Sequence, residues 1–171
     1  VNNETDTDCA TGEVGEIWIR SAQVMAGYWK NPEETAKAIT KDKWFKSGDA
    51  GYVDADGFVY VVDRIKDMVL RGGENVYCVE VETVLFEHVA IRDCAVIGLP
   101  HDKLGEEVAA VLVAADGFGS DSDAEILAFL KTRLASFKIP SKIFWHQEEL
   151  PRNATGKVLK KDLRDDYAIR K

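Results

Sequence analysis

A charged segment, residues 63–67 (D-R-I-K-D), lies between two apolar stretches and most constrains how this chain can fold. The stretch before it, residues 58–62, is aromatic and β-branched, as is typical of a strand. Apolar residues resume at Met68. Because a run of charges is more often a solvated linker than part of a core, we predict a domain boundary here. Residues 1–62 then form one unit, residues 63–66 the connection, and residues 67–171 a second unit.

Composition limits the possible partners of the chain. Its 171 residues suit one domain or one domain plus a fragment, and a hydrophobic content of 46% can supply a core. A net charge of −8 argues against a general nucleic-acid or anionic-membrane surface. No apolar run approaches the roughly 18 residues that a membrane span needs. Residues 152–171, however, contain seven Lys/Arg and three Asp/Glu, which suits a phosphate-bearing ligand or a solvated helix.

The cysteines and histidines predict neither a disulfide framework nor a metal site. The three cysteines are odd in number and form no CxxC pair, so free thiols in a reducing cytoplasm fit better. The three histidines show no HxxxH spacing, and we predict no structural metal. Residues 1–13 lack an initiator Met and the apolar core of a signal peptide, which predicts an internal segment of a longer chain.

The elements expected in the first unit are mostly strands. Residues 16–20 predict a short strand, and residues 44–62 predict a strand, a turn at 54–57 and a second strand. A helix should begin at Asn31 and Pro32, because Asn is a good N-cap and Pro suits the first helical position.

The second unit alternates helices and strands. We expect a helix over 79–88 and another from a capping box at Ser122 and Glu125 to about residue 135. A polar loop over 151–157 should lead into a short basic helix. The expected strands lie at 94–99, 108–114 and 142–146. The predicted fold class is α+β: a small α/β domain preceded by a mostly β segment.

Two motifs could bind a nucleotide. In residues 47–49 (S-G-D), the ionised Asp49 could accept hydrogen bonds from two ribose hydroxyls, although S-G-D is also common in turns. Farther along, Arg64 could reach a phosphate or ribose, and Gly72-Gly73 would let a ligand approach the backbone. A solvated linker followed by a hairpin turn explains the second motif equally well.

The third motif, residues 151–157 (P-R-N-A-T-G-K), is not a P-loop. A Walker loop needs Gly at position 151 and Ser or Thr at position 158, and this chain has Pro151 and Val158. What remains is Lys157 on a flexible loop, where its charge could neutralise a developing phosphoryl charge. Taken alone, the motif favours an ordinary surface lysine.

Together and in this order, the motifs resemble the AMP-forming acyl-CoA synthetases, which are adenylate-forming enzymes. The resemblance begins near Gly15, covers nearly the whole chain, and includes residues 80–82 (E-V-E). It implies that residues 1–62 are the C-terminal end of a large nucleotide- and acyl-binding domain. Residues 63–66 would be a hinge, and residues 67–171 the mobile C-terminal domain.

The resemblance also assigns roles to single residues. Lys157 matches the catalytic lysine that bridges the acyl carboxylate and the α-phosphate during adenylation. Asp49 matches the residue that binds the AMP ribose, and Arg64 an arginine that contacts the nucleotide. Lys66 falls at the family's hinge.

A second set of matches concerns coenzyme A. Gly72 and Gly73 resemble the loop lining the pantetheine tunnel, and Lys138, with Phe137 beside it, lies where some relatives contact the CoA nucleotide. The sequence departs from the family at Asp63, where Gly is frequent, and at Cys78, where Pro is frequent. Neither position touches the implied chemistry, so only local changes of geometry are expected.

The implied reaction is an ATP-dependent ligation of a fatty or aryl carboxylic acid to CoA through an acyl-adenylate, in the cytoplasm. ATP/AMP and CoA are substrates, and Mg²⁺ accompanies ATP, bound mainly outside this chain. Without the N-terminal domain the chain should be inactive and should self-associate through residues 15–62. Two alternatives stay open: an adenylation domain that loads a carrier protein, and a non-catalytic module that binds AMP or CoA.

Overall fold

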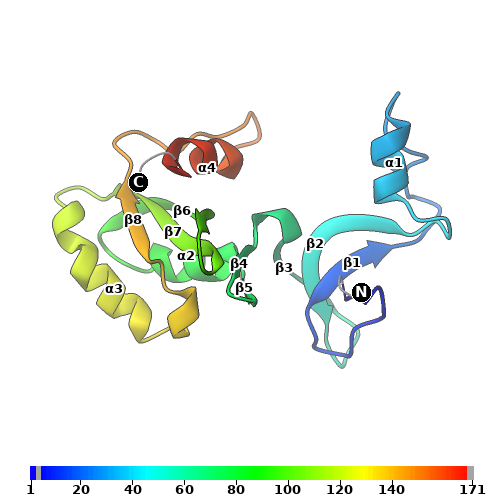
Figure 1. Ribbon diagram of the computed structural model, residues 1–171, viewed down its shortest axis with the longest axis horizontal. Helices are drawn as coiled ribbons and strands as arrows, with labels where there is room; N and C mark the ends of the chain where they lie inside the picture. Colours follow the sequence, from blue (N-terminus) through cyan, green and yellow to red (C-terminus); the bar gives the residue numbers. More distant parts are fainter. Residues whose placement is uncertain (3–4, 169–171) are drawn as a thin grey trace. The chain divides into compact units, whose positions relative to one another are not determined.

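The computed structural model describes residues 1–2 and 5–168. The chain divides into two compact units, Val1–Lys66 and Asp67–Lys171. Each unit has its own β-sheet, and the two sheets share no strand (Figure 1).

The first unit is built on a three-stranded antiparallel sheet with the order β1-β2-β3. These strands are Gly15–Ile19, Phe45–Val53 and Val59–Arg64. The turn between β2 and β3 forms around Asp54, whose Oδ1 accepts hydrogen bonds from the backbone N–H groups of Asp56 and Phe58. The predicted order of strand, turn and strand is therefore confirmed.

Helix α1 (Pro32–Ala38) lies between β1 and β2 in the sequence. The side chain of Asn31 accepts a hydrogen bond from the Glu34 N–H at 3.1 Å, and Pro32 is the first helical residue. Both features match the start predicted from the sequence, because a capped N–H and a preset φ favour helix initiation.

The first unit has almost no interior. Of its described residues, only Ala50, Gly51 and Asp63 are buried. Large apolar side chains stay in contact with solvent, with exposed fractions of 66% for both Phe58 and Val61. A single small sheet with no second layer packed over it buries only a low fraction of its surface.

The second unit contains a five-stranded mixed sheet. Its main path is β5-β4-β7-β6, and β8 pairs in parallel with β7. The long hairpin of β6 and β7 forms its centre, with Cys94 opposite Leu112 and Gly98 opposite Val108. The strands are β4 Val69–Arg71, β5 Glu74–Val76, β6 Ile91–His101, β7 Gly105–Ala114 and β8 Lys142–Trp145.

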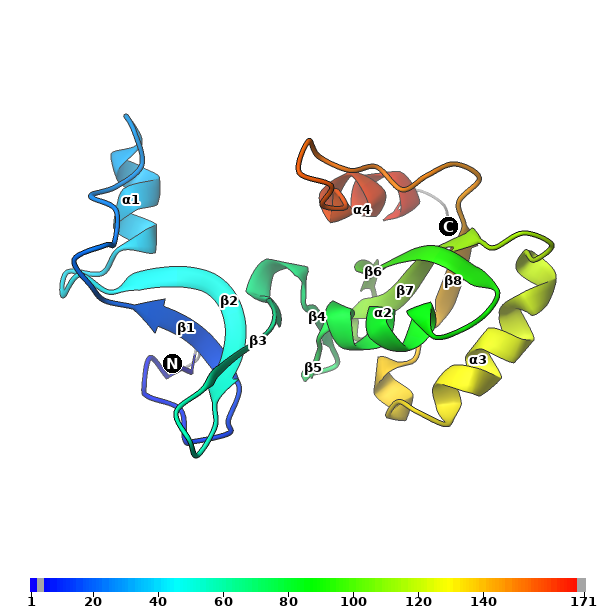
Figure 2. The ribbon, with the colours of Figure 1, turned by 180° about the vertical axis from the view of Figure 1, so that it is seen from behind.

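Helices cover both faces of this sheet (Figure 2). Helices α2 (Cys78–Phe86) and α3 (Asp123–Lys131) share one core with Val96, Val108, Ala110 and Leu112. On the other side, Leu163 and Tyr167 of α4 (Lys160–Ala168) share a core with Ala95, Ile97, Leu99, Ala109, Val111 and Val113. Alternate residues of β6 and β7 thus enter opposite cores, as the period of two in a strand requires. The predicted α+β class is confirmed.

Two local expectations are wrong. Ser122 makes no side-chain cap, because it closes a 3₁₀ turn (Ser120–Ser122) with the αR backbone angles φ −88° and ψ −3°, away from the extended geometry of a capping residue. Helix α4 is also not basic, since its sequence KKDLRDDYA carries as many acidic as basic residues. The prediction counted Lys157, which precedes the helix, and residues 170–171, which lie outside the described residues.

Candidate functional site

Lys157 lies on a loop whose conformation is supported by side-chain hydrogen bonds. The loop is organised around Asn153, whose Oδ1 accepts hydrogen bonds from the Thr155 N–H at 3.0 Å, the Thr155 hydroxyl at 2.8 Å and the Lys157 N–H at 2.9 Å. Gly156 adopts φ +83°, a left-handed conformation that glycine reaches without strain. The Lys157 side chain is exposed. The loop therefore presents a cation on a defined backbone.

Asp49 and Arg64, predicted separately, are neighbours in the sheet. They are direct partners in the register of β2 and β3. The Arg64 Nε lies 3.1 Å from the Asp49 Oδ1, and both side chains are partly exposed. An arginine hydrogen-bonded to a carboxylate orients it, so the pair can offer both acceptors and donors to one ligand.

The backbone conformation at the centre of the S-G-D motif favours glycine. Gly48 adopts φ +73°, and its N–H donates to the Glu16 Oε1 at 3.0 Å. The Asp49 N–H donates to the Ser47 hydroxyl at 3.1 Å. These contacts fix the backbone around Asp49.

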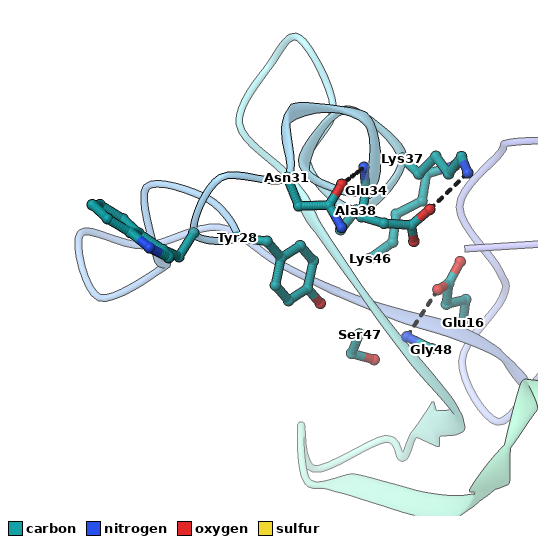
Figure 3. A pocket seen from close by; sticks show the side chains of 10 residues that line it. Glu16, Tyr28, Asn31, Glu34, Lys37, Ala38, Lys46, Ser47 and Gly48 are labelled. Carbon is teal, nitrogen blue, oxygen red and sulfur yellow. Dashed lines mark hydrogen bonds and ion pairs between the residues drawn. The ribbon is translucent and has the colours of Figure 1, made fainter.

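An open pocket of about 670 Å³ lies beside this motif. Figure 3 shows Tyr28 and residues of α1 on one side of the pocket, and Ser47, Gly48 and Glu16 of the sheet on the other. The neighbouring Trp29 is 87% exposed. A pocket of this size can hold a small organic ligand, and its aromatic side chains offer a stacking surface.

Lys66 lies within a 3₁₀ turn, Ile65–Asp67, that directly follows β3. Its side chain is exposed, whereas the next residue, Asp67, is buried. Asp67 accepts from Arg164 Nη2 at 3.1 Å, and its carbonyl accepts from the Cys78 thiol at 2.8 Å. The second unit therefore holds Asp67 firmly.

The two residues that differ from the family pattern, Asp63 and Cys78, are both buried and hydrogen-bonded to nearby groups. Cys78 is fully buried and makes the thiol contact to Asp67 described above. Asp63 is buried, and its Oδ1 accepts from the Arg64 N–H at 2.7 Å.

Gly72 and Gly73 form the two-residue turn between β4 and β5. Both have positive φ, +62° and +89°, as a hairpin turn that matches the twist of the strands requires. A Cβ on Gly73 would meet open space. In the described part of the chain, the Nε of the preceding Arg71 is buried without a hydrogen-bond partner.

Lys138 already has a partner. Its Nζ lies 2.7 Å from each carboxylate oxygen of Glu80, in the first turn of α2. Phe137 packs against the core shared by α2 and α3. The sequence motif contained Glu80, but no spacing rule could pair it with a residue 58 positions away.

The Cys94 thiol is too buried to serve as a nucleophile. Burial raises the pKa of the Cys94 thiol well above its usual value, and nearby Glu82 and Asp93 add to the rise. Across residues 1–2 and 5–168, no cluster of three or more His, Cys, Asp and Glu side chains could hold a metal ion. No helix in those ranges is both long enough and apolar enough to cross a membrane.

Residues 80–157, most of the second unit, match the family described as AMP-binding enzyme C-terminal domain, and the match ends at Lys157. The second unit therefore contains, over these residues, a match to an AMP-binding enzyme C-terminal domain. The expected kinship with adenylate-forming enzymes is thereby confirmed.

Relatives and solved structures extend this likeness over the whole chain. A feruloyl-CoA synthase from Amycolatopsis sp. is 48% identical over 90% of this chain and 30% of its own length. A long-chain-fatty-acid–CoA ligase from Bacillus subtilis is 44% identical over 96% of this chain and 29% of its own. ATP-bound MatB from Rhodopseudomonas palustris is 37% identical with a TM-score of 0.90, over 99% of this chain and 33% of that chain. The chain thus corresponds to the C-terminal portion of CoA ligases and spans about 30% of their length.

Proposed function

We propose that this chain supplies the C-terminal portion of an ATP-dependent carboxylate–CoA ligase. In the first step, a carboxylate oxygen attacks the α-phosphorus of ATP, and pyrophosphate leaves. In the second step, the CoA sulfur attacks the acyl carbon, the thiol proton is lost, and AMP leaves. The observation that carries the proposal is the match to the AMP-binding enzyme C-terminal domain, which ends at Lys157, an exposed lysine on a loop held by hydrogen bonds.

Lys157 serves the first step as the catalytic lysine. Its ammonium can bridge the attacking carboxylate and the α-phosphate, where negative charge gathers in the transition state. The hydrogen bonds of Asn153 support this role, because a backbone held before the reaction needs no reorganisation during it.

Asp49 and Arg64 bind the nucleotide. The Asp49 carboxylate accepts hydrogen bonds from the ribose hydroxyls, and Arg64 contacts the nucleotide while orienting Asp49. Their 3.1 Å contact supports a shared role. The pocket beside residues 47–48 gives the ligand room next to the pair.

The second step uses another part of the second unit. Gly72 and Gly73 line the pantetheine path, where the open space at Gly73 leaves room for the chain of CoA. Lys138, which Glu80 holds in place, is the candidate contact for the CoA nucleotide. Lys66 acts as the hinge, because it lies on an exposed turn beside the fixed Asp67. Residues 67–171 then alternate between the two steps, residues 63–66 form the hinge, and residues 1–62 belong to the large domain.

The substrates are ATP, CoA and a fatty or aryl acid. The acid class rests on relatives that are named for ferulate and for long-chain fatty acids. Mg²⁺ accompanies ATP as part of the substrate and is bound mainly outside this chain. We place the protein in the cytoplasm, since Cys9, Cys78 and Cys94 are all free thiols. The chain needs the rest of the enzyme for activity.

A carrier protein is the second candidate acceptor. A fatty acid–[acyl-carrier-protein] ligase from Streptomyces coeruleorubidus is 43% identical over 91% of this chain. CoA remains our first choice, because the two more similar relatives described above are both named as enzymes that act with CoA.

A chimera tests the proposal. The chain replaces the corresponding part of the Amycolatopsis feruloyl-CoA synthase, and the two half-reactions are measured separately. Lys157→Ala should lower ATP–pyrophosphate exchange on the order of 10²–10³-fold, because a charge contact to the transition state is lost. It should spare thioester formation from ready-made acyl-adenylate. Lys161→Ala, which removes an exposed lysine on α4, is the matched control. Equal losses in both half-reactions would show that Lys157 has another role.

A further inference from the structure

The guanidinium group of Arg152 connects the Lys157 loop to the sheet. Arg152 Nη2 lies 2.6 Å from the Asp93 Oδ2 on β6, and Arg152 Nη1 donates to the Gly156 carbonyl at 2.8 Å. Arg152 and Val158 also form an isolated antiparallel bridge that closes the loop at its base. The two ends of one planar group thus connect a rigid strand to the residue immediately before Lys157.

A second tie lies on the other side of the lysine. Lys160, the first residue of α4, places its Nζ 2.7 Å from the Glu82 Oε1 of α2, and both side chains are largely buried. The same oxygen accepts from the Val96 N–H of β6 at 2.7 Å. Lys157 is therefore held five residues before and three residues after its own position.

We propose that Arg152 and Asp93 are positioning residues for the adenylation step. The inference rests on the proposed function, since it assigns them the task of holding Lys157 where the phosphoryl charge develops. Arginine suits the task because its fork reaches two acceptors in different directions, which a lysine cannot do. A displacement of about 1 Å in a reacting group can cost on the order of 10²-fold in rate.

Asp93→Asn isolates this role. The Asp93 Oδ1 accepts from the Cys94 N–H at 3.0 Å, and an asparagine keeps that contact. Its amide nitrogen then faces the Arg152 guanidinium, donor against donor, and the tie opens. Asp93 lies on a strand of the sheet and is joined to the loop through its ion pair with Arg152, so a loss of rate in Asp93→Asn reports on positioning.

The kinetic test uses the chimera described above. Asp93→Asn and Arg152→Lys should each lower kcat for adenylation about 10- to 100-fold, leave KM for ATP within about 3-fold, and spare thioester formation from acyl-adenylate. Glu107→Gln breaks a different half-buried ion pair, to Lys142 at 2.8 Å, and should leave adenylation unchanged. If Arg152→Lys lowers adenylation while Asp93→Asn does not, Arg152 acts on the substrate directly, and the inference is overturned.

A second measurement needs no activity. In the 171-residue chain, ¹⁵N relaxation should show ordered amides at Thr155, Gly156 and Lys157, with order parameters of about 0.85. Asp93→Asn should lower them below about 0.6 while the β6 and β7 amides keep their values. Unchanged order parameters would overturn the inference. If Asp93→Asn lowers the order parameters as expected but the unsubstituted chimera forms no adenylate, the proposed function is wrong. The role of the Arg152–Asp93 contact in ordering the loop is then still supported.

Discussion

Replacing Glu82 should strongly destabilise the second unit, because its carboxylate forms a largely buried ion pair. Its side chain is 15% exposed, and that of its partner Lys160 is 12% exposed. Glu82→Ala removes the carboxylate that pairs with the largely buried Lys160 ammonium, and breaking a buried pair in this way costs about 3–5 kcal/mol. The cost includes about 1–3 kcal/mol for the Val96 N–H, which loses its acceptor.

This loss is large against the total. Domains are typically stable by about 5–15 kcal/mol, so the variant unit should unfold measurably near room temperature. Native-state hydrogen exchange at the buried amides of β6 and β7 measures the free energy of opening of this unit without contribution from the first one. Glu87→Ala is the matched control, since Glu87 pairs with Arg133 at 3.6 Å while both side chains are exposed, and such pairs contribute about 0–1 kcal/mol.

The double variant Glu82→Met with Lys160→Met decides between charge and packing. Replacing both partners by apolar side chains of similar length should cost far less than Glu82→Ala, because no buried charge is left alone. A double variant that is as unstable as the single one would refute the electrostatic reasoning. So would a loss below about 1 kcal/mol for Glu82→Ala, the value for an exposed pair.

Two further outcomes follow from burial and charge. Burial pushes the pKa of Glu107 up, but the contacts with Lys142 and Ser141 outweigh it and leave the pKa below its usual value. A lowered folded-state pKa stabilises above the unfolded-state pKa of about 4.3, and this stabilisation disappears as the pH falls. Glu107→Gln should therefore lower the urea midpoint at pH 7 much more than at pH 3, and equal losses would contradict the assignment. Separately, light scattering should show concentration-dependent association of the 171-residue chain through residues 15–62, and the pair Phe58→Ser and Val61→Ser should reduce it, because both side chains are largely exposed apolar surface. A monodisperse monomer at every concentration would count against it.

Sequence reasoning succeeded where one short stretch determines the structure. The Asn31-Pro32 pair starts a helix through contacts within four residues. Gly72-Gly73 forms a turn with positive φ because the two residues carry the conformational preference themselves. Cys94 to Leu99 and Val108 to Ala114 lie in strands, as their apolar runs predict.

Sequence reasoning failed where interactions beyond the local stretch determine the structure. The Ser122 and Glu125 spacing fits a capping box, yet Gly119 leads the chain into a 3₁₀ turn that precedes α3. The contacts that organise the candidate site are also out of reach of any spacing rule. Arg152 and Asp93 lie 59 residues apart, and neither shows a periodicity that would pair it with the other.

The ion pairs around β6 have a consequence for solubility. β6 is the terminal strand of its sheet, and residues 94–99 (C-A-V-I-G-L) combine high β-propensity with no charge. An unpaired edge of this composition is a template on which a second chain could add a strand, as in amyloid assembly. Glu82 occupies the outward N–H of Val96, with Lys160 beside it, and Arg152 sits over Asp93 at the start of the segment. The same side chains that hold the Lys157 loop therefore block intermolecular β-pairing along this edge strand.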